Sequence, residues 1–275
     1  MRWLETVLFG LVAGICEFLP ISSQAHRSIL LCLFGQDHEN PLLSFFIHTG
    51  ALIALIFACK SQLMRIYTEY TLLKVPRHRR KRFPDAQSRM DIMLLRTTMI
   101  TMLLGFLLYP VVDGWSGRLY IIALMLFLNG LILHIPMYLP IGNKDSRAMS
   151  RLDAILIGLA GAISVIPGIS RVATTFSVAS ARGADLQQAY KWSILLCLPA
   201  LAVEILLDIF AMITGGLAGV GFVFVIQCIL AAVFAYLGAY AAITLMRSLV
   251  QRTGLYGFSY YCVGAALFAF ILYLI

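Results

Sequence analysis

Residues 10–25 read Gly-Leu-Val-Ala-Gly-Ile-Cys-Glu-Phe-Leu-Pro-Ile-Ser-Ser-Gln-Ala, an apolar run that a proline and a cluster of polar residues interrupt. The surrounding apolar stretch, about 4–34, is long enough to enter a membrane, but Pro20 and the serines after it break a continuous helix. Two half-helices joined by a loop are therefore expected. Irregular backbone at membrane depth is tolerated only where protein or water surrounds it, which favours a re-entrant hairpin.

The same pattern returns at an offset of 148 residues, where residues 158–173 align without gaps to residues 10–25. Six of the sixteen positions are identical. The second apolar stretch, 152–180, is broken by Pro167 and the residues that follow it. Chance similarity between apolar sequences is one interpretation. The other is an inverted repeat, in which two interrupted helices meet near the bilayer midplane and form a site for an anion.

Composition excludes most soluble classes of protein. The chain has 275 residues, of which 61% are hydrophobic and 12% charged, and its mean hydropathy is +0.89. A soluble protein could not cover its surface with so few polar side chains. The apolar runs have helix length, and the roughly ten-residue alternation typical of a barrel strand is absent from the sequence. We therefore expect an all-α polytopic membrane protein.

Six further runs are long enough to cross the membrane, which takes about 20 residues. The segment 60–91 holds nine basic and three acidic residues, a balance of +6 out of the net charge of +8. A short basic loop beside a span stays in the cytoplasm, so this charge orients the bundle and does not indicate nucleic-acid binding. Alternation then brings the first hairpin in from outside and the second from inside. The six spans are approximately 42–59, 92–111, 118–139, 187–213, 219–246 and 254–275.

These boundaries predict a single integral membrane domain, 1–275, built from two repeats. Repeat one covers about 1–139 and contains the re-entrant segment 4–34. Repeat two covers about 152–275 and contains the re-entrant segment 152–180. Each repeat has an odd number of crossings, so the second is inverted relative to the first.

Two ionisable residues lie in the broken segments, Glu17 in the first and Arg171 in the second. Charged groups at membrane depth cost at least about 2.5 kcal/mol each and usually face a cavity or a partner. They could form a salt bridge that only joins the repeats, or they could line a functional cavity with the polar groups near them. Arg171 offers a planar fork for phosphate oxygens, and Ser23 with His26 could act as nucleophile and base. Glu17 could hold a divalent cation or act as a general base.

Four polar residues in the spans have less specific interpretations. His48 and His134 are lone imidazoles on apolar segments, and we interpret them as hydrogen-bonded core residues. Glu204 and Asp208 lie four residues apart on one helix face. They could line an access path, or they could simply reach the outer interface.

Two stretches resemble the signature motifs of a known family. Residues 14–26 read Gly-Ile-Cys-Glu-Phe-Leu-Pro-Ile-Ser-Ser-Gln-Ala-His, and residues 167–175 read Pro-Gly-Ile-Ser-Arg-Val-Ala-Thr-Thr. Both are similar to motifs of the BacA-type undecaprenyl-diphosphate phosphatase family, and the resemblance in length, repeat layout and motif order runs nearly end to end. It implies the inverted-repeat bundle. It also implies removal of the terminal phosphate from the undecaprenyl diphosphate carrier at the outer face of the membrane, with a divalent cation, Mg²⁺ or Ca²⁺.

The resemblance also implies roles for particular residues. Glu17, Ser23, His26 and Arg171 would be catalytic, and Glu17 would contact the cation. Chemistry of this kind consists mostly of positioning and charge stabilisation, which suits a pocket of fixed dipoles. Together with the polar side chains of the two loops, the predicted diphosphate-binding set is Ser22, Gln24, Ser170, Arg171, Thr174 and Thr175.

One departure from the family pattern bears on catalysis. The family has a glutamate four residues before Glu17, where this chain has Ala13. A site with one carboxylate should bind a divalent cation weakly unless diphosphate oxygens and waters complete the shell. The alternative to a phosphatase is therefore a non-hydrolytic polyprenyl-phosphate transporter or scramblase with the same fold.

The phosphatase interpretation carries expectations about the setting of the protein. It would be a multi-pass protein of the bacterial cytoplasmic membrane that recycles a lipid carrier for peptidoglycan synthesis, with bacitracin resistance as a consequence. Its partners would be a polyprenyl diphosphate lipid and the membrane, without nucleic acid. The interpretation also allows a homodimer.

Overall fold

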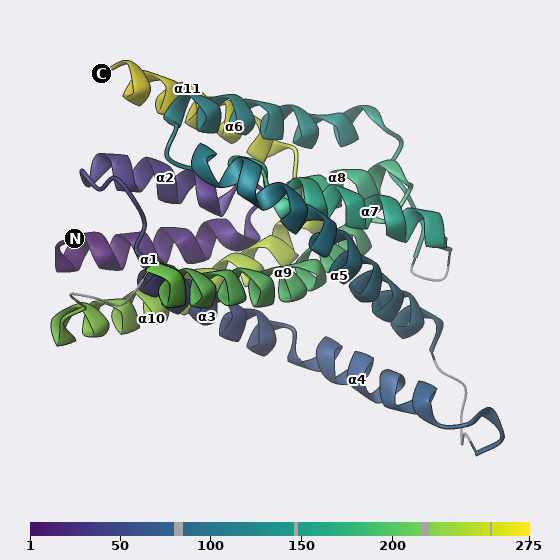
Figure 1. Ribbon diagram of the computed structural model, residues 1–275. Coiled ribbons are helices and arrows are strands. Elements are labelled where there is room, and N and C mark those ends of the chain that lie inside the picture. The colour runs from purple at the N-terminus through teal and green to yellow at the C-terminus, as the bar shows by residue number, and fades with distance from the viewer. Residues whose placement is uncertain (80–84, 146–147, 216–219, 254) are drawn as a thin grey trace.

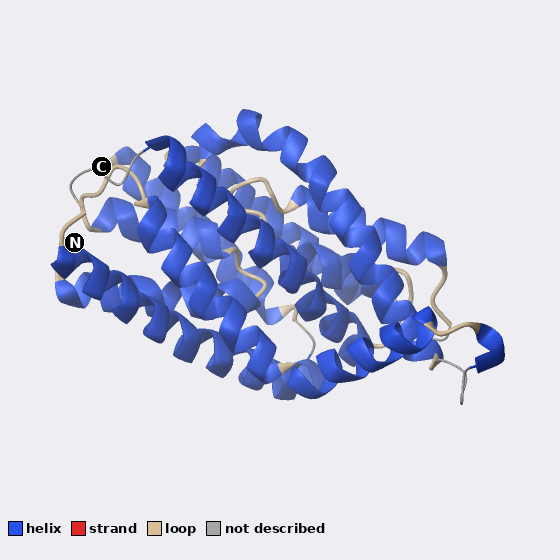
Figure 2. Ribbon diagram, turned by 60° about the horizontal axis from the view of Figure 1, so that its bottom comes forward, coloured by secondary structure: helices blue, strands red, loops and turns tan. Residues whose placement is uncertain are grey.

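The computed structural model describes residues 1–79, 85–145, 148–215, 220–253 and 255–275, and these residues are predominantly helical (Figure 2). An isolated β-bridge joins Lys144 and Ala184, and the described residues contain no strand. The predicted all-α class is confirmed. The α-helices are α1 (Trp3–Phe18), α2 (Ser23–Leu33), α3 (Pro41–Ala58), α4 (Lys60–Lys74), α5 (Ala86–Val112), α6 (Leu119–His134), α7 (Arg151–Ile163), α8 (Arg171–Ala181), α9 (Leu186–Gly215), α10 (Phe222–Thr253) and α11 (Gly257–Leu274). Short 3-10 helices cover Arg77–Arg79, Asp113–Trp115 and Ile135–Tyr138.

Each of the two broken segments forms a pair of helices. Residues 19–22 separate α1 from α2, and residues 164–170 separate α7 from α8. Ser22 has a positive φ of 68°, and its hydroxyl accepts a backbone N–H from the first turn of α2. Ser170 caps α8 in the same way. Since each cap fixes where the second helix starts, the serines of both motifs set the geometry of the two turns.

The two helix pairs enter the bundle from opposite ends, so that their turns meet near its middle (Figure 1). Asn129 of α6 joins the turns. Its side-chain amide donates to the Pro20 carbonyl at 2.9 Å, and its oxygen accepts the Ser170 N–H at 2.8 Å. Asn129 is fully buried, so both bonds are made away from solvent. One side chain therefore holds the two breaks together.

The helices of the two predicted repeats pack across one another. α1 packs along α10 and α7 packs along α5, so the first helix of each repeat lies against a long helix of the other. α3 packs against α9, and α6 against α11. Gly10 and Gly14 let α1 approach α10 closely, because a Cβ at either position would collide with the backbone at Ala231 or Ala235. Small residues at four-residue spacing are typical of closely packed helices in membranes.

Five of the described helices are long and apolar enough to cross a membrane. They overlap five of the six predicted spans and cover Pro41–Ala58, Leu119–Tyr138, Leu186–Gly215, Phe222–Val250 and Gly257–Leu274. The sixth predicted span, 92–111, lies within α5, which is not among the five. The chain is therefore an all-helical integral membrane protein.

The basic segment 60–91 is not a simple loop, contrary to the sequence-based expectation. α4 occupies its first half, and residues 80–84, which include part of its basic run, lie outside the described residues. Leu63, Ile66 and Leu73 recur at helical spacing in α4, and Ile66 is only 8% exposed. This apolar face stabilises a helix where the high charge alone suggested a loop.

Candidate active site

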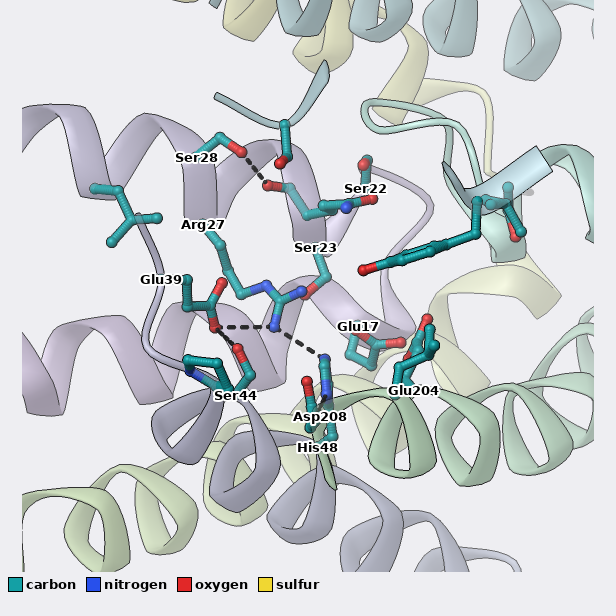
Figure 3. A pocket seen from close by; sticks show the side chains of 18 of the residues that line it. Glu17, Ser22, Ser23, Arg27, Ser28, Glu39, Ser44, His48, Glu204 and Asp208 are labelled. Carbon is teal, nitrogen blue, oxygen red and sulfur yellow. Dashed lines mark hydrogen bonds and ion pairs between the residues drawn. The ribbon is translucent and has the colours of Figure 1, made fainter. Parts of the chain in front are cut away.

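A cavity of about 560 Å³ opens beside the two turns. Its charged side chains come from α1, α2, α8, α9 and the segment before α3, and α3 contributes His48 (Figure 3). Its rim includes residues of the 112–117 connection and of the segment before α3. The charged and titratable side chains that line it are Glu17, Arg27, Asp37, His38, Glu39, His48, Tyr109, Arg171, Glu204 and Asp208, with Cys16 beside them.

Arg171 lies between two carboxylates from different helices. Its Nη1 is 3.3 Å from Glu17 Oε1, and its Nη2 is 2.6 Å from Glu204 Oε1. The side chains of Arg171 and Glu17 are 12% and 9% exposed. The second oxygen of Glu204, Oε2, is buried and has no hydrogen-bond partner in the structure. The first residue of α8 is thus fixed by one acid from α1 and one from α9.

A second arginine, Arg27 of α2, organises the other side of the cavity (Figure 3). Its Nη1 is 3.2 Å from Glu39 Oε1 and 2.9 Å from His48 Nε2. Glu39 also accepts a hydrogen bond from the Ser44 hydroxyl at 2.6 Å. The His48 ring continues this chain, since its Nδ1 is 2.7 Å from Asp208 Oδ2.

The contacts of His48 define its tautomer. A guanidinium has donors only, so the Nε2 of His48 must accept from Arg27. The hydrogen then resides on Nδ1 and is donated to Asp208. His48 is therefore a neutral imidazole oriented by a carboxylate, rather than only a core residue.

Four of the predicted site residues with uncharged side chains line the cavity. Ser22, Ser23, Gln24 and Ser170 all contribute to its wall. The Ser23 hydroxyl donates to the Ala13 carbonyl at 3.2 Å, and the Ser170 hydroxyl donates to the Leu19 carbonyl at 3.4 Å. Both residues thus line the cavity while their hydroxyl hydrogens point to backbone carbonyls of the first helix pair.

His26 does not line the cavity and does not contact Ser23. Its Nδ1 is 2.9 Å from the Ser22 carbonyl, and its Nε2 is 2.8 Å from the hydroxyl of Tyr261. The two rings are stacked, with their centroids 5.6 Å apart. The predicted pairing of Ser23 with His26 is therefore absent from this arrangement, because α11 offers His26 a better partner.

Thr174 and Thr175 also lie outside the cavity wall. Both are buried, and their hydroxyls donate back to carbonyls of their own helix. The Thr174 bond to Ser170 is 3.1 Å long, and the Thr175 bond to Arg171 is 2.6 Å long. Threonine makes such bonds within helices routinely, and the bonds leave these hydroxyls turned away from a ligand.

Ala13 lies in an apolar cluster and not on the cavity wall. It is 1% exposed and packs with Phe9, Leu43 and Ile47. The acid that shares Arg171 with Glu17 is instead Glu204, which lies on a helix 30 residues long in the second repeat. The sequence alone could not reveal that Glu204 takes this place, because no sequence pattern relates position 204 to position 13.

Several cavity residues were missed or given another role by the sequence. Arg27 directly follows His26, and its place in a broken membrane segment was a signal that could have identified it. Glu39 and Ser44 gave no comparable signal, since they lie in a polar connection and at a helix start. Glu204 and Asp208 both line the cavity, so their shared helix face lies toward the polar interior of the bundle.

The described residues include no group of three His, Cys, Asp or Glu side chains placed to hold a metal ion. Glu17 and Glu204 both face Arg171, which already occupies one oxygen of each. A divalent cation prefers about six oxygen ligands. These two carboxylates therefore fit a cation only if a bound substrate supplies most of the remaining oxygens.

Comparison with known proteins gives consistent matches along the chain. The family model described as "Bacitracin resistance protein BacA" matches residues 6–268. Undecaprenyl-diphosphatase 1 of Shouchella clausii is 30% identical over 275 residues, covering 98% of this chain and 96% of the relative. The undecaprenyl-diphosphatase of Methanobrevibacter smithii is 29% identical, with 95% and 94% covered. That of Thermodesulfovibrio yellowstonii is 30% identical, with 98% and 96% covered.

Proposed function

This chain belongs to the BacA family, and from that premise we propose that it is a membrane phosphatase that removes the terminal phosphate from undecaprenyl diphosphate. The observation that carries the proposal is the position of Arg171, at the start of α8 and on the wall of an open polar cavity, between Glu17 and Glu204. The reaction would return the lipid carrier as its monophosphate for cell-wall synthesis. The matching family model is described as a bacitracin resistance protein.

Substrate binding rests on two guanidinium groups. Arg171 and Arg27 both line the cavity, and a guanidinium can bind two phosphate oxygens at once through its planar fork. The oxygens of the diphosphate would replace those of Glu17 and Glu204 on Arg171. The serine hydroxyls at the two turns are within the same wall and would bind the remaining phosphate oxygens.

The chemistry requires a proton acceptor as well as cations. Water adds its oxygen to the terminal phosphorus, the bond from that phosphorus to the bridging oxygen breaks, and the water gives up a proton. Glu17 and Glu204 would accept this proton once Arg171 turns to the phosphate. In this proposal Glu204 supplies the second carboxylate that Ala13 does not.

We propose the divalent cation only as an ion that binds together with the substrate. Carboxylates outnumber guanidinium groups in the cavity, so a bound diphosphate would need further positive charge. Glu17 would contact Mg²⁺ or Ca²⁺ on the protein side, and the cation would neutralise charge on the phosphates. Phosphate release that continues unchanged in EDTA would remove the cation from the proposal.

The proposed topology has six transmembrane helices and two re-entrant hairpins, arranged as two inverted repeats. The opposite directions of the two hairpins and the exchange of packing between α1–α10 and α7–α5 support it. We place the protein in the bacterial cytoplasmic membrane, with 60–91 in the cytoplasm. The cavity would then open to the outside, because the 112–117 connection lies at its rim. The homodimer stays a prediction, which a measurement of the protein's size in detergent can test.

A phosphate-release assay tests the function directly. Purified full-length protein in detergent is given undecaprenyl diphosphate, with and without divalent cation, and compared with Arg171→Ala. We expect release by the parent and a loss of at least about 100-fold in the variant, since a transition-state arginine contributes that much or more. Equal release from the two proteins would overturn the proposal. The relatives all carry the name of a diphosphatase, which favours hydrolysis over the transporter alternative.

A further inference from the structure

A second cavity, of about 660 Å³, lies at the other end of α9. α9 lines the candidate active site with Val203 to Ala211, whereas it lines the second cavity with Gln187 to Ile194. Lys191 and Asp208 are roughly 25 Å apart along the helix at its usual rise per residue. α4 and the end of α10 form the remaining walls. The two cavities are therefore separate sites.

Three basic side chains line the second cavity. Arg65 and Lys191 are both 3.2 Å from the same oxygen of Asp91. Asp91 is fully buried and accepts a further hydrogen bond from Trp192 Nε1 at 2.9 Å. The negative charge of Asp91 is therefore divided among three donors. Arg65 and Lys191 therefore share this carboxylate, and both side chains line the cavity.

The third basic residue, Arg247, has no carboxylate partner within the described part of the chain. Its Nη2 donates to the Ala58 carbonyl at 2.7 Å and lies 3.2 Å from the Cys59 sulfur. Neither neighbour carries a formal charge. Asp185, the only acidic residue on this wall, already accepts the Gln187 N–H at the start of α9. The balance on the cavity wall is thus positive.

Two buried polar groups on the same wall have no hydrogen-bond partner among the described residues. They are the hydroxyl of Tyr190 and the side-chain nitrogen of Gln62. Tyr190 is only 4% exposed. Leaving a buried donor unsatisfied is unfavourable, so such groups usually face a ligand or an ion. The hydroxyl and the amide can both donate, as can the three basic side chains beside them.

We propose that this second cavity binds a phosphate group, either of free phosphate or of a lipid headgroup. The convergence of ammonium, guanidinium, amide and phenol donors on one pocket selects an oxyanion, and phosphate oxygens suit the arginine forks. The basic segment 60–74 forms one side, so the site faces the cytoplasm in the proposed topology. The assignment does not depend on hydrolysis at the first cavity.

Binding measurements in an Arg171→Ala background test the site, because that substitution removes the main phosphate ligand of the first cavity. The probes are inorganic phosphate added to the full chain in detergent, with chloride at equal ionic strength as reference, and nanodiscs that contain phosphatidic acid or only phosphatidylcholine. We expect saturable binding in at least one arm. Binding of phosphate identifies a free-phosphate site, and binding of phosphatidic acid alone identifies a headgroup site.

Variants of the wall give the decisive comparison. Tyr190→Phe removes a hydroxyl with no hydrogen-bond partner in the described part of the chain, so the fold should be unaffected and affinity should fall about 5-fold. Arg247→Gln should lower affinity at least about 10-fold. Tyr240→Phe, on an exposed part of α10 away from both cavities, is the matched control and should change nothing. Absence of binding in both arms, or affinities equal to the control in both wall variants, would overturn the assignment.

Discussion

The two cavities share α9 but balance their charges in opposite ways. In the first, Arg171 lies between Glu17 and Glu204, and Arg27 lies beside Glu39. In the second, Arg247 contacts only a carbonyl and a sulfur among the described residues. A wall of donors can bind an anion, but Asp185, its one acid among the described residues, already accepts backbone N–H groups at the start of α9. The comparison teaches that the acids, more than the arginines, distinguish a site for hydrolysis from a site for binding.

The largest effect should come from removing the central cation of the first cavity. Arg171→Ala is expected to reduce phosphate release by at least about 100-fold, because the charge that develops on the leaving phosphate loses its stabilising partner. Arg171→Lys is the matched variant and should recover only part of the rate, since an ammonium cannot hold two oxygens in one plane. Phosphate binding in the second cavity should not change, and a parallel loss there would break the comparison.

The second-largest effect should come from removing the Asn129 side chain, which links the two turns beside the first cavity. Asn129→Ala removes the donor to Pro20 and the acceptor for Ser170, so that the Ser170 N–H loses this partner and the Pro20 carbonyl retains a 3.8 Å contact from the Cys262 thiol. We expect about 2 to 4 kcal/mol of lost stability, measured by thermal unfolding in detergent. Asn143 lies in an irregular connection outside the helices, and Asn143→Ala serves as the control. Equal melting temperatures for the two variants would contradict this role.

Glu204 tests whether the acids of the first cavity carry the chemistry. Glu204→Gln keeps the shape and one contact to Arg171 but removes the charge, and we expect turnover to fall about 30-fold with a smaller change in KM. Glu39→Gln is a matched change in the same cavity, at an acid that faces Arg27. A rise in KM with unchanged kcat for Glu204→Gln would make this residue a binding group only.

Asp208 should have a moderate effect through His48. Asp208→Asn removes the negative charge that holds the hydrogen on Nδ1 and lets an amide N–H face the ring instead, and so loosens the ring against Arg27. We expect a loss of about 10-fold in kcat/KM, and a shift in the pH profile that a purely structural change would not cause. An unchanged pH profile would show that the Asp208–His48 pair serves packing alone.

The smallest effect is expected at Ala13. If Glu204 supplies the second carboxylate, Ala13→Glu should raise phosphate release less than about 3-fold, because the site already has two acids. The new side chain must also leave an apolar cluster that buries Ala13 almost completely. A gain of 10-fold or more in the same assay would show that the native cavity lacks an acid and would contradict the role of Glu204.

The sequence predicted the fold class well because its strongest signals are physical. Apolar runs longer than a bilayer crossing and two proline-broken repeats leave few architectures open. The motif residues Glu17, Ser22, Ser23 and Arg171 also lie together on one cavity wall. These residues are close to one another because a helix break and a cap fix their positions locally. Such local rules can be read from a single chain.

The rest of the site depends on packing between distant helices. Nothing near Glu204 in the sequence shows that α9 brings it to Arg171, and nothing near His26 shows that its Nε2 pairs with the hydroxyl of Tyr261 on α11. The sequence predicts His48 as a hydrogen-bonded core residue, and His48 is indeed buried and bonded at both ring nitrogens. What the sequence does not show is that its partners, Arg27 and Asp208, line the cavity with it.

The amide of Asn129 has a consequence for motion. It donates to the turn of one hairpin and accepts from the turn of the other, so neither turn can slide without losing a buried hydrogen bond. A carrier that exposes its site to each leaflet in turn must rock its halves around that point. Two turns held together in this way suit a catalyst, whose functional groups stay fixed while the lipid substrate binds and leaves.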